Sequence, residues 1–577
     1  MSSFWGIFWV DASSPQNAAE SWKKIAKVGG RDANAEAGKH WLSNLQSPWL
    51  LIIDSADTSE DAIKLQFPSG DRGCILVTTR NPRLKINATV GHLSLDRLEE
   101  DEANDLLHKT TNHEPWDSAA KSSASSIAKH LGYLPLALVH AGRAILHQLC
   151  TLQGYIPFFN RTLDDFRLRR PSIFSDEDDE SGMGAFMSFD IIYSGLEAQT
   201  NRDTRQASVS RDAIELINVF AFLHSNDICL ALLVKAGNNL QNALSREQAP
   251  TEGRNEEPPA PPVDTWQRLK SWTMTMAIRL QHRPPFLPLM LRPIEARSFD
   301  ESRARRAIDL LVRMSLISES SEPGSYSMHP LVHVWVRKRL STAAQALWCD
   351  AAANVLASSI KLPPVIDEPG DQDFYLRILP HVSQVQVMKQ DVLTQLQRNR
   401  QQQSTLRSWL WAGNNAAPSV TDIYNSARYS RVYMECAKLE DAERLQRLVL
   451  DFAVGRVGEC HPGTVAIQLV LSVTLWHLAR AAEAQELQER ALKSCRVILG
   501  DKHSQTLKAM DALGETYWQR GWLKEAKALH ESAIEGMEGR SKLKREWLMS
   551  ISHLGRVYEW YVPCRTDPHM PPNNGSC

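Results

Sequence analysis

The carboxy-terminal third of the sequence repeats itself with a period of 42 residues. A fixed period of this size, with apolar residues at helical spacing, predicts stacked helical hairpins. Small residues in the repeat let paired helices approach closely, and a further unit, shifted by one residue, starts at Leu554. The recurring pairs are Gly458 and Gly500, His461 and His503, Thr464 and Thr506, Leu471 and Leu513, Ala484 and Ala526, and Ala491 and Ala533.

The amino-terminal part alternates strand-like with helix-like segments. Aromatic and β-branched residues predict strands at Phe4–Val10, Trp49–Asp54 and Cys74–Thr79, with a fourth at His92–Leu95. An alternation of strands and helices indicates a parallel sheet with helices on its faces. We therefore expect residues 1–105 to form an α/β core on such a sheet.

Polar side chains follow two of these strands directly. Asp54 ends the second strand, and Arg80 follows the third. Ligands of open α/β sheets bind at this carboxyl edge. In nucleotide-hydrolysing proteins, an acidic strand tip holds Mg²⁺ through water and a Thr-Arg tip senses the terminal phosphate. The usual phosphate cradle, a G-x-x-x-x-G-K-[ST] loop, does not occur in the 577 residues.

The composition of the chain argues against several classes of partner and location. The net charge of −2 gives no field over the whole chain that would attract nucleic acid or an anionic membrane. The nine cysteines include no C-x-x-C pair, which predicts a reducing, cytoplasmic location and no zinc site or disulfide scaffold. No apolar stretch reaches about 18 residues, so we expect no membrane-spanning helix.

The middle of the chain reads as mostly helical. Residues 118–150 are predicted to be helical with one break, where Gly132 suits a helix C-cap and Pro135 suits the first turn of the next helix. The acidic run Asp176–Glu180 is typical of a solvated loop. A further helical segment is expected over residues 211–237.

A helix beside a short hairpin is predicted further along. Ala249–Val263 is rich in Pro, Glu and Gly, which indicates a flexible insertion. From Arg303 the pattern gives a helix, then Leu316–Ser318 and Tyr326–His329 on either side of a turn, then a helix over Val332–Leu340. This order is typical of a winged helix.

The expected organisation is an α/β parallel-sheet core that is truncated, followed by a helical domain, a winged helix and an all-α solenoid. The predicted boundaries are 1–105 for the partial α/β core, 106–185 for the helical domain, 186–345 for the winged-helix domain with its insertion near 249–263, 346–415 for a helical connector, and 416–577 for the repeats.

Five segments in this order resemble the signal-transducing ATPases with numerous domains, in particular fungal NB-ARC-type receptors with tetratricopeptide repeats. They look like the strand after the first helix of that nucleotide-binding domain, its Walker B segment, its sensor-1 strand, its G-x-P motif and its MHD region. These segments are Phe8–Ser14, Leu50–Asp57 (LLIIDSAD), Ile75–Asn81 (ILVTTRN), Gly132–Leu138 (GYLPLAL) and Met328–Trp335 (MHPLVHVW). The repeats resemble the variety found in kinesin light chains.

The resemblance implies roles for four residues. Asp54 would hold Mg²⁺ through water, Arg80 would read the terminal phosphate, and Pro135 would pack on the adenine. His329 would contact the β-phosphate of ADP and keep the winged helix closed. The implied function is an NLR-like switch for signal transduction and innate recognition. ADP locks such a switch shut, and exchange for ATP opens it into a homo-oligomer.

The chain departs from that family in two places. Only Met1-Ser2-Ser3 precede the first strand, where the family has its P-loop and first helix, so the backbone cradle and its lysine are absent. The residue after Asp54 is Ser55, where many relatives have a second carboxylate, and serine is a poor general base. We therefore expect impaired binding of ADP or ATP with Mg²⁺ and at most weak ATPase activity.

Two other interpretations remain open from the sequence. In the first, the chain is a nucleotide-independent scaffold or adaptor, and the repeats bind a protein or peptide ligand in their groove without regulation. In the second, the sequence is an incomplete gene model, and an upstream exon supplies the P-loop and an effector domain. Conventional hydrolases and redox enzymes are not supported, because G-x-S-x-G, H-E-x-x-H and G-x-G-x-x-G are all absent.

Overall fold

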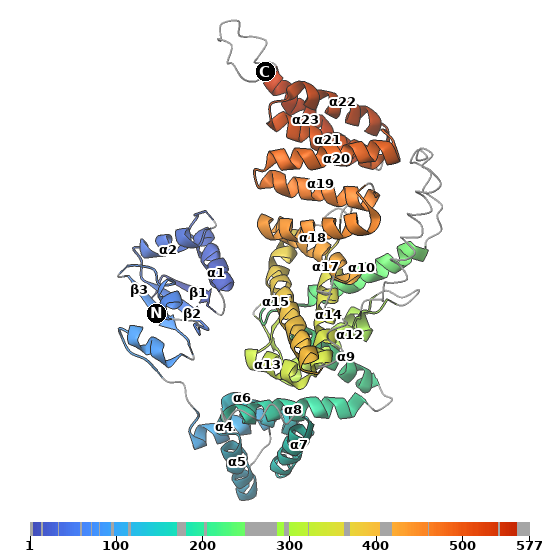
Figure 1. Ribbon diagram of the computed structural model, residues 1–577. Coiled ribbons are helices and arrows are strands. Elements are labelled where there is room, and N and C mark those ends of the chain that lie inside the picture. The colour runs from blue at the N-terminus through green and yellow to red at the C-terminus, as the bar shows by residue number, and fades with distance from the viewer. Residues whose placement is uncertain are drawn as a thin grey trace. The chain divides into compact units, whose positions relative to one another are not determined.

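The computed structural model describes residues 4–12, 15–32, 34–57, 60–70, 72–79, 81–93, 97–112, 117–169, 180–200, 205–248, 286–293, 299–320, 322–362, 370–403, 418–459, 461–540 and 543–561. The chain divides into two compact units, Met1–Asp96 and Arg97–Cys577 (Figure 1). The expected insertion at Ala249–Val263, and the acidic run up to Asp179, lie outside the described residues.

A parallel sheet of three strands forms the first unit, in the order β1-β2-β3. The strands are β1 (Gly6–Asp11), β2 (Trp49–Asp54) and β3 (Gly73–Val77), and they are joined by α1 (Pro15–Val28), α2 (Ala35–Ser43) and α3 (Glu60–Lys64); η1 (Pro82–Asn87) follows β3. The predicted parallel sheet is confirmed. The fourth strand is not seen, because residues 91–93 have no regular structure and the next three lie outside the described part.

The two faces of this sheet differ in burial. On one face Val10, Leu51 and Ile53 are fully buried, and they share a core with Trp22 of α1. On the other face the side chains stay open: Ile7, Trp9 and Leu76 are 65%, 56% and 53% exposed. The sequence predicts helices on both faces, but the described helices of this unit leave one apolar face uncovered.

Helices make up the beginning of the second unit. They are α4 (Glu100–Thr111), α5 (Ser118–His130), α6 (Pro135–Leu146), α7 (Tyr155–Arg169), α8 (Glu180–Thr200) and α9 (Arg205–Phe220). The break between α5 and α6 falls where the sequence predicts it. Gly132 and Tyr133 both have positive φ, of 63° and 57°, and Pro135 opens the next helix.

A small antiparallel sheet with its flanking helices follows. The elements are β4 (Ile228–Cys229), α10 (Leu230–Gln248), η3 (Leu289–Leu291), α12 (Glu301–Arg313), β5 (Ser318–Glu319), β6 (Ser325–Ser327) and α13 (Pro330–Arg339), and the strand order is β4-β6-β5. The helix, hairpin and helix occur in the expected order. The single helix predicted over residues 211–237 is wrong, since α9 ends at Phe220 and β4 separates it from α10.

Nine further helices complete the described part of the chain. They are α14 (Thr342–Ser358), α15 (Asp371–Gln403), α17 (Val420–Glu435), α18 (Leu439–Val457), α19 (Pro462–His477), α20 (Ala481–Leu499), α21 (Ser504–Gln519), α22 (Leu523–Met537) and α23 (Lys544–Tyr561). From α18 to α23 the helices lie in successive layers (Figure 1), and each packs on the next. The predicted solenoid of helical hairpins is confirmed.

Equivalent residues of the repeat have the same backbone conformation, burial or hydrogen bonds in each copy. Gly458 and Gly500 end helices with φ of 88° and 83°. The recurring alanines are fully buried between helices. In both copies a histidine accepts a hydrogen bond from the backbone at the start of the next helix, and a threonine hydroxyl donates to the glycine carbonyl: the residues are His461, His503, Thr464 and Thr506.

Each hairpin turns through one residue in the left-handed region. Ala437, Ala479 and Gly521 have φ of 56°, 59° and 76°, and they lie 42 residues apart. The N–H of the next residue closes the turn each time, with Lys438 donating to Tyr433, Arg480 to Leu475 and Trp522 to Tyr517. This is the hydrogen bond of a Schellman motif, which lets a helix reverse direction.

Candidate functional site

The carboxyl edge of the parallel sheet carries Asp54 at the end of β2. Thr78, just after β3, donates a hydrogen bond from its hydroxyl to the Asp54 carboxylate. The same hydroxyl accepts the backbone N–H of Ser55 at 3.0 Å. Ser55 has a φ of 58°, so the chain turns sharply away after the carboxylate. The arrangement fixes one carboxylate oxygen of Asp54 by hydrogen bonding.

A second carboxylate at this edge escaped the sequence analysis. Asp11 ends β1 and is the register partner of Asp54 across the sheet. The amide nitrogen of Asn17 donates to the Asp11 carboxylate at 3.2 Å. The signal for Asp11 was its place at a strand end, but only the strand register shows that it stands beside Asp54. Arg80, the predicted phosphate sensor, lies outside the described residues.

The other two predicted residues belong to the second unit. Pro135 is exposed in the first turn of α6. His329 caps α13, and its Nδ1 accepts the backbone N–H of Leu331 at 3.2 Å. Burial lowers the pKa of His329 below its usual value. Its side chain therefore favours the neutral form, which can accept this hydrogen bond.

His140 of α6, which the sequence analysis missed, lies within electrostatic range of His329. Burial first, and then the nearby His329 and Arg143, lower the pKa of His140 to about 3. Its ring packs edge-on against Phe189 at 4.6 Å between centroids, and neither ring nitrogen has a hydrogen-bond partner among the described residues. His329 thus lies close enough to α6, the helix that begins at Pro135, to act on His140 electrostatically.

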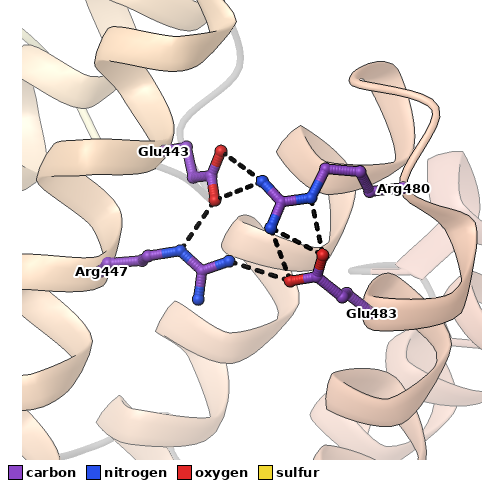
Figure 2. A network of polar contacts seen from close by, with 4 residues as sticks. All are labelled: Glu443, Arg447, Arg480 and Glu483. Atoms are coloured by element: carbon purple, nitrogen blue, oxygen red, sulfur yellow. Dashed lines mark hydrogen bonds and ion pairs between the residues drawn. The ribbon is translucent and has the colours of Figure 1, made fainter.

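Four charged side chains form a ring of ion pairs between α18 and α20, the second helices of two consecutive hairpins. Figure 2 shows the guanidinium groups of Arg447 and Arg480 lying between the carboxylates of Glu443 and Glu483. Arg480 approaches Glu443 at 2.8 Å and Glu483 at 2.6 Å, and Arg447 approaches the same two at 2.7 and 3.1 Å. Because most of these groups are exposed, the ion pairs add little to the free energy of unfolding. We therefore infer that the ring serves mainly to align α18 with α20.

Three helices of the array meet at Asp511. His530 Nδ1 of α22 lies 2.8 Å from its carboxylate, and His553 Nδ1 of α23 lies 3.1 Å from it. The three possible ligand atoms lie within 4.8 Å of one another. A metal ion on Nδ1 would leave a buried Nε2–H of His530 without an acceptor, since that nitrogen has no partner among the described residues. The arrangement fits a hydrogen-bonded cluster better than a metal centre.

A groove of about 610 Å³ opens between α20 and α22. Buried Leu492 and Leu513 lie at its floor, and Val497 at its side is 70% exposed. Charges of both signs surround these apolar groups, so the groove can take an apolar side chain with polar neighbours. The full lining is Glu489, Leu492, Lys493, Arg496, Val497, Leu513, Tyr517, Glu525, Ala528 and Leu529.

Comparison with known families finds one match, to the tetratricopeptide repeat, over residues 464–539. These residues include α20, α21, α22 and the whole lining of the groove. The predicted tetratricopeptide repeat is thereby confirmed for this part of the array, and such repeats imply interaction with other proteins. No curated protein matches the chain.

Solved structures with some likeness to the chain include the following three. A putative kinesin light chain from Podosopora anserina, with nearly identical TPR-like repeats, is 19% identical, with 34% of this chain and 90% of that chain covered and a TM-score of 0.25. A STAND protein with a tetratricopeptide repeat sensor from Pyrococcus horikoshii is 13% identical, with 96% and 84% covered and a TM-score of 0.27. Yeast Tom70 is 13% identical, with 82% and 98% covered and a TM-score of 0.21. None of these scores shows a shared overall fold.

None of the described helices combines the length and apolar character needed to cross a bilayer.

Proposed function

We propose that this chain is a protein-binding receptor or adaptor, whose repeat array takes up a segment of a partner protein in the groove between α20 and α22. The observation that carries this proposal is the groove itself, which lies wholly within the matched tetratricopeptide residues. Its size, about 610 Å³, is in the range of specific binding pockets, roughly 300–1,000 Å³.

The chemistry of the lining defines the partner segment. Lys493 and Arg496 supply positive charge from α20, and Glu525 supplies negative charge from α22. Leu492 and Leu513 are covered and can desolvate one apolar side chain. A segment with one apolar anchor between an acidic and a basic residue would match Lys493 and Glu525 beside this apolar floor, while Arg496 already pairs with Asp501 at 3.1 Å.

The proposal can be tested by panning a displayed library of random peptides against the full chain. Enriched peptides should carry the apolar anchor flanked by opposite charges. Ala528 lines the groove and is exposed, so Ala528→Arg should fill it and weaken binding about tenfold, equivalent to about 1.4 kcal/mol.

A matched control comes from the neighbouring helix. Ala482 is an exposed alanine of α20 outside the groove, so Ala482→Arg adds the same side chain elsewhere. It should leave peptide binding unchanged. Peptides that bind the Ala528→Arg chain as well as the original would show that the groove is not the binding site.

An NLR-like switch that responds to ADP and ATP is the second candidate. Two observations favour it: Thr78 holds the Asp54 carboxylate at the sheet edge, and His329 lies near α6. In this proposal Asp54 holds Mg²⁺ through water, Arg80 and His329 contact phosphates, and Pro135 packs on the adenine. Hydrolysis would be weak at most, because Ser55 is a poor general base.

Calorimetric titration of the full chain with ADP and ATP in Mg²⁺ tests this second candidate. Micromolar binding that His329→Ala and Asp54→Asn each weaken would support the switch. His461→Ala removes a similar helix cap in the array and should leave the titration unchanged. Absence of binding would reject the switch and leave the protein-binding proposal standing.

A further inference from the structure

In the last complete hairpin, α22 covers one face of α21. Leu507, Met510 and Gly514 of that face are buried. A Cβ on Gly514 would lie 2.8 Å from the ring of His530 in α22. A Cβ on Gly536 of α22 would lie 2.3 Å from Leu507. The second helix of the hairpin is therefore in direct contact with this face.

The corresponding face of α23 is uncovered. Leu513 recurs 41 residues later as Leu554, which places Leu548, Ile551 and Gly555 at the covered positions of α21. Leu548 is 53% exposed and Ile551 is 39% exposed. A Cβ on Gly555 would meet nothing within 4 Å. Among the described residues, no second helix takes the place that α22 has on α21.

The uncovered residues Leu548, Ile551 and Gly555 form a stripe along α23, and charges of opposite sign lie at its two ends. Lys544 lies one turn before Leu548, and Glu559 lies one turn after Gly555. Steps of three and four residues keep all of these side chains on one helix face. Both charged residues are exposed, and neither has an ion pair within the described part of the chain.

The stripe is complementary to itself when a second α23 runs antiparallel to it. A two-fold axis midway between residues 551 and 552 places Lys544 opposite Glu559 of the second copy. It also places the large Leu548 opposite the open space at Gly555 of the second copy. Opposed charges and a large residue against a small one are the features of a self-complementary helix pair.

The sequence that follows α23 is poorly suited to cover the stripe. Residues 562–577 lie outside the described part, and their sequence contains Pro563, Pro568, Pro571 and Pro572. Proline inside a helix removes a hydrogen bond and clashes with the preceding turn. Four prolines among these residues therefore make this segment a poor helical partner for the stripe.

We propose that a second copy of this chain docks on the stripe of α23, so that two α23 helices pair antiparallel and form a homodimer through the array. This goes beyond peptide binding in the groove, because the stripe is formed by α23 alone and the groove lining by α20, α21 and α22. One pair of 18-residue helices is a small interface, so the dimer is weak, with a dissociation constant on the order of micromolar.

Sedimentation velocity of the full chain over a range of concentrations tests the proposal. The original chain should pass from monomer to dimer as the concentration rises through about 1 to 100 μM. Leu548→Arg puts a charge at the centre of the interface and should abolish the dimer. Because Leu548 is half exposed in the single chain, its thermal unfolding should be unchanged.

Charge reversal gives a sharper test of the antiparallel register. Lys544→Glu and Glu559→Lys each place like charges opposite each other at both ends of the pair, so each should weaken self-association about tenfold. An equimolar mixture of the two variants should recover the original dimer, since every contact across a mixed pair is then attractive. Arg545→Glu, one residue aside from the stripe, is the matched control and should associate like the original chain.

Three outcomes would overturn the proposal. One is a monomer at every concentration, which would leave the stripe to a helix of a different protein. Another is a dimer that survives Leu548→Arg. The third is a mixture of the two charge variants that associates no better than either alone.

Discussion

A single carboxylate, Asp511, joins three helices of the array through two imidazoles. The hydrogen bond to Asp511 raises the pKa of His553, and Glu515 adds to this effect while Arg556 opposes it. Burial acts to raise the pKa of Asp511, but hydrogen bonds from His530 and His553 outweigh it and hold this pKa below its usual value. The charged form of His553 is therefore the one that the folded array favours.

We predict that the array loses stability as the pH rises above about 6.5 and through the raised pKa of His553. The folded pKa of His553 lies above its unfolded value. Its contribution is therefore full below about pH 6.5 and is lost as the pH rises through the folded pKa. Asp511 stays ionised throughout this window, because its pKa is lowered. Urea unfolding of the full chain at several pH values measures the effect.

His553→Asn is the control for this pH dependence. Asparagine keeps a hydrogen-bond donor near Asp511 but cannot take up a proton in this range. The variant should have a flatter profile of stability against pH. A profile as steep as that of the original chain would show that another group is responsible.

The residues of the proposed nucleotide site show how far sequence reasoning reaches at this scale. Asp54 was recognisable because an apolar run stops on it, and β2 does end there. Asp11 carries a similar local signal, but its proximity to Asp54 depends on strand register, which joins residues far apart in the chain. His140 gave no signal, because a histidine within an apolar helix reads as ordinary packing.

At the scale of elements, the three hairpin turns of the array share one backbone conformation, but the residue in the left-handed region is alanine in two turns and glycine in the third. Ala437 and Ala479 occupy the left-handed region, where Gly521 stands in the third turn. A residue with a Cβ is strained there by about 1–2 kcal/mol, whereas glycine is not. Two of the three turns thus hold avoidable strain.

We predict that Ala479→Gly raises the free energy of unfolding by about 0.5–1 kcal/mol, because relief of strain exceeds the added entropy of the unfolded chain. Gly521→Ala should lower it by about 1 kcal/mol. Urea denaturation of the two variants beside the original chain is the measurement.

Ala528→Gly is the matched control, since Ala528 is an exposed residue inside α22 with helical geometry. Glycine there should destabilise the chain by about 1 kcal/mol. If Ala479→Gly destabilised the chain as Ala528→Gly does, the turn would not be strained.

Elements were predicted well where the information is local and repeated. The array was recognisable because the same 42-residue pattern recurs in the sequence. The break between α5 and α6 was recognisable because Gly132 and Pro135 are residues typical of a helix end and a helix start. The helix expected over residues 211–237 failed because apolar residues on both sides of a short polar run favoured one continuous helix. The polar run His224–Asp227 lies between Leu223 and Ile228, and the pairing of β4 with β6 shows that the helix is interrupted there.

At the scale of the whole molecule, the described residues form separate hydrophobic cores. The first unit has its own cluster, which includes Ile53, and the largest cluster of the second unit includes Leu311. Small domains bury a smaller fraction of their surface and are correspondingly less stable. The two units should therefore unfold separately.

We predict at least two transitions in differential scanning calorimetry, and that core substitutions shift them independently. Ile53→Ala should destabilise the first unit by about 2–5 kcal/mol, and Leu311→Ala should do the same to the second. Each variant serves as the control for the other. One cooperative transition that both variants shift equally would show that the units unfold together.

The largest gap in the sequence analysis belongs to this scale. An apolar strand does not show how many of its faces are covered, so Ile7, Trp9 and Leu76 read as interior residues although they are exposed. The open stripe of α23 was hidden for the same reason, since its sequence matches that of a covered helix. Coverage depends on which other elements are present.

The arrangement of the array in layers also has a mechanical consequence. Each helical hairpin packs mainly on its immediate neighbours, so tension applied along the stack would load one interface after another. The hairpins would then peel away one at a time. Each would release a 42-residue length of chain, up to roughly 140 Å when fully extended, so the array would behave as an extensible tether.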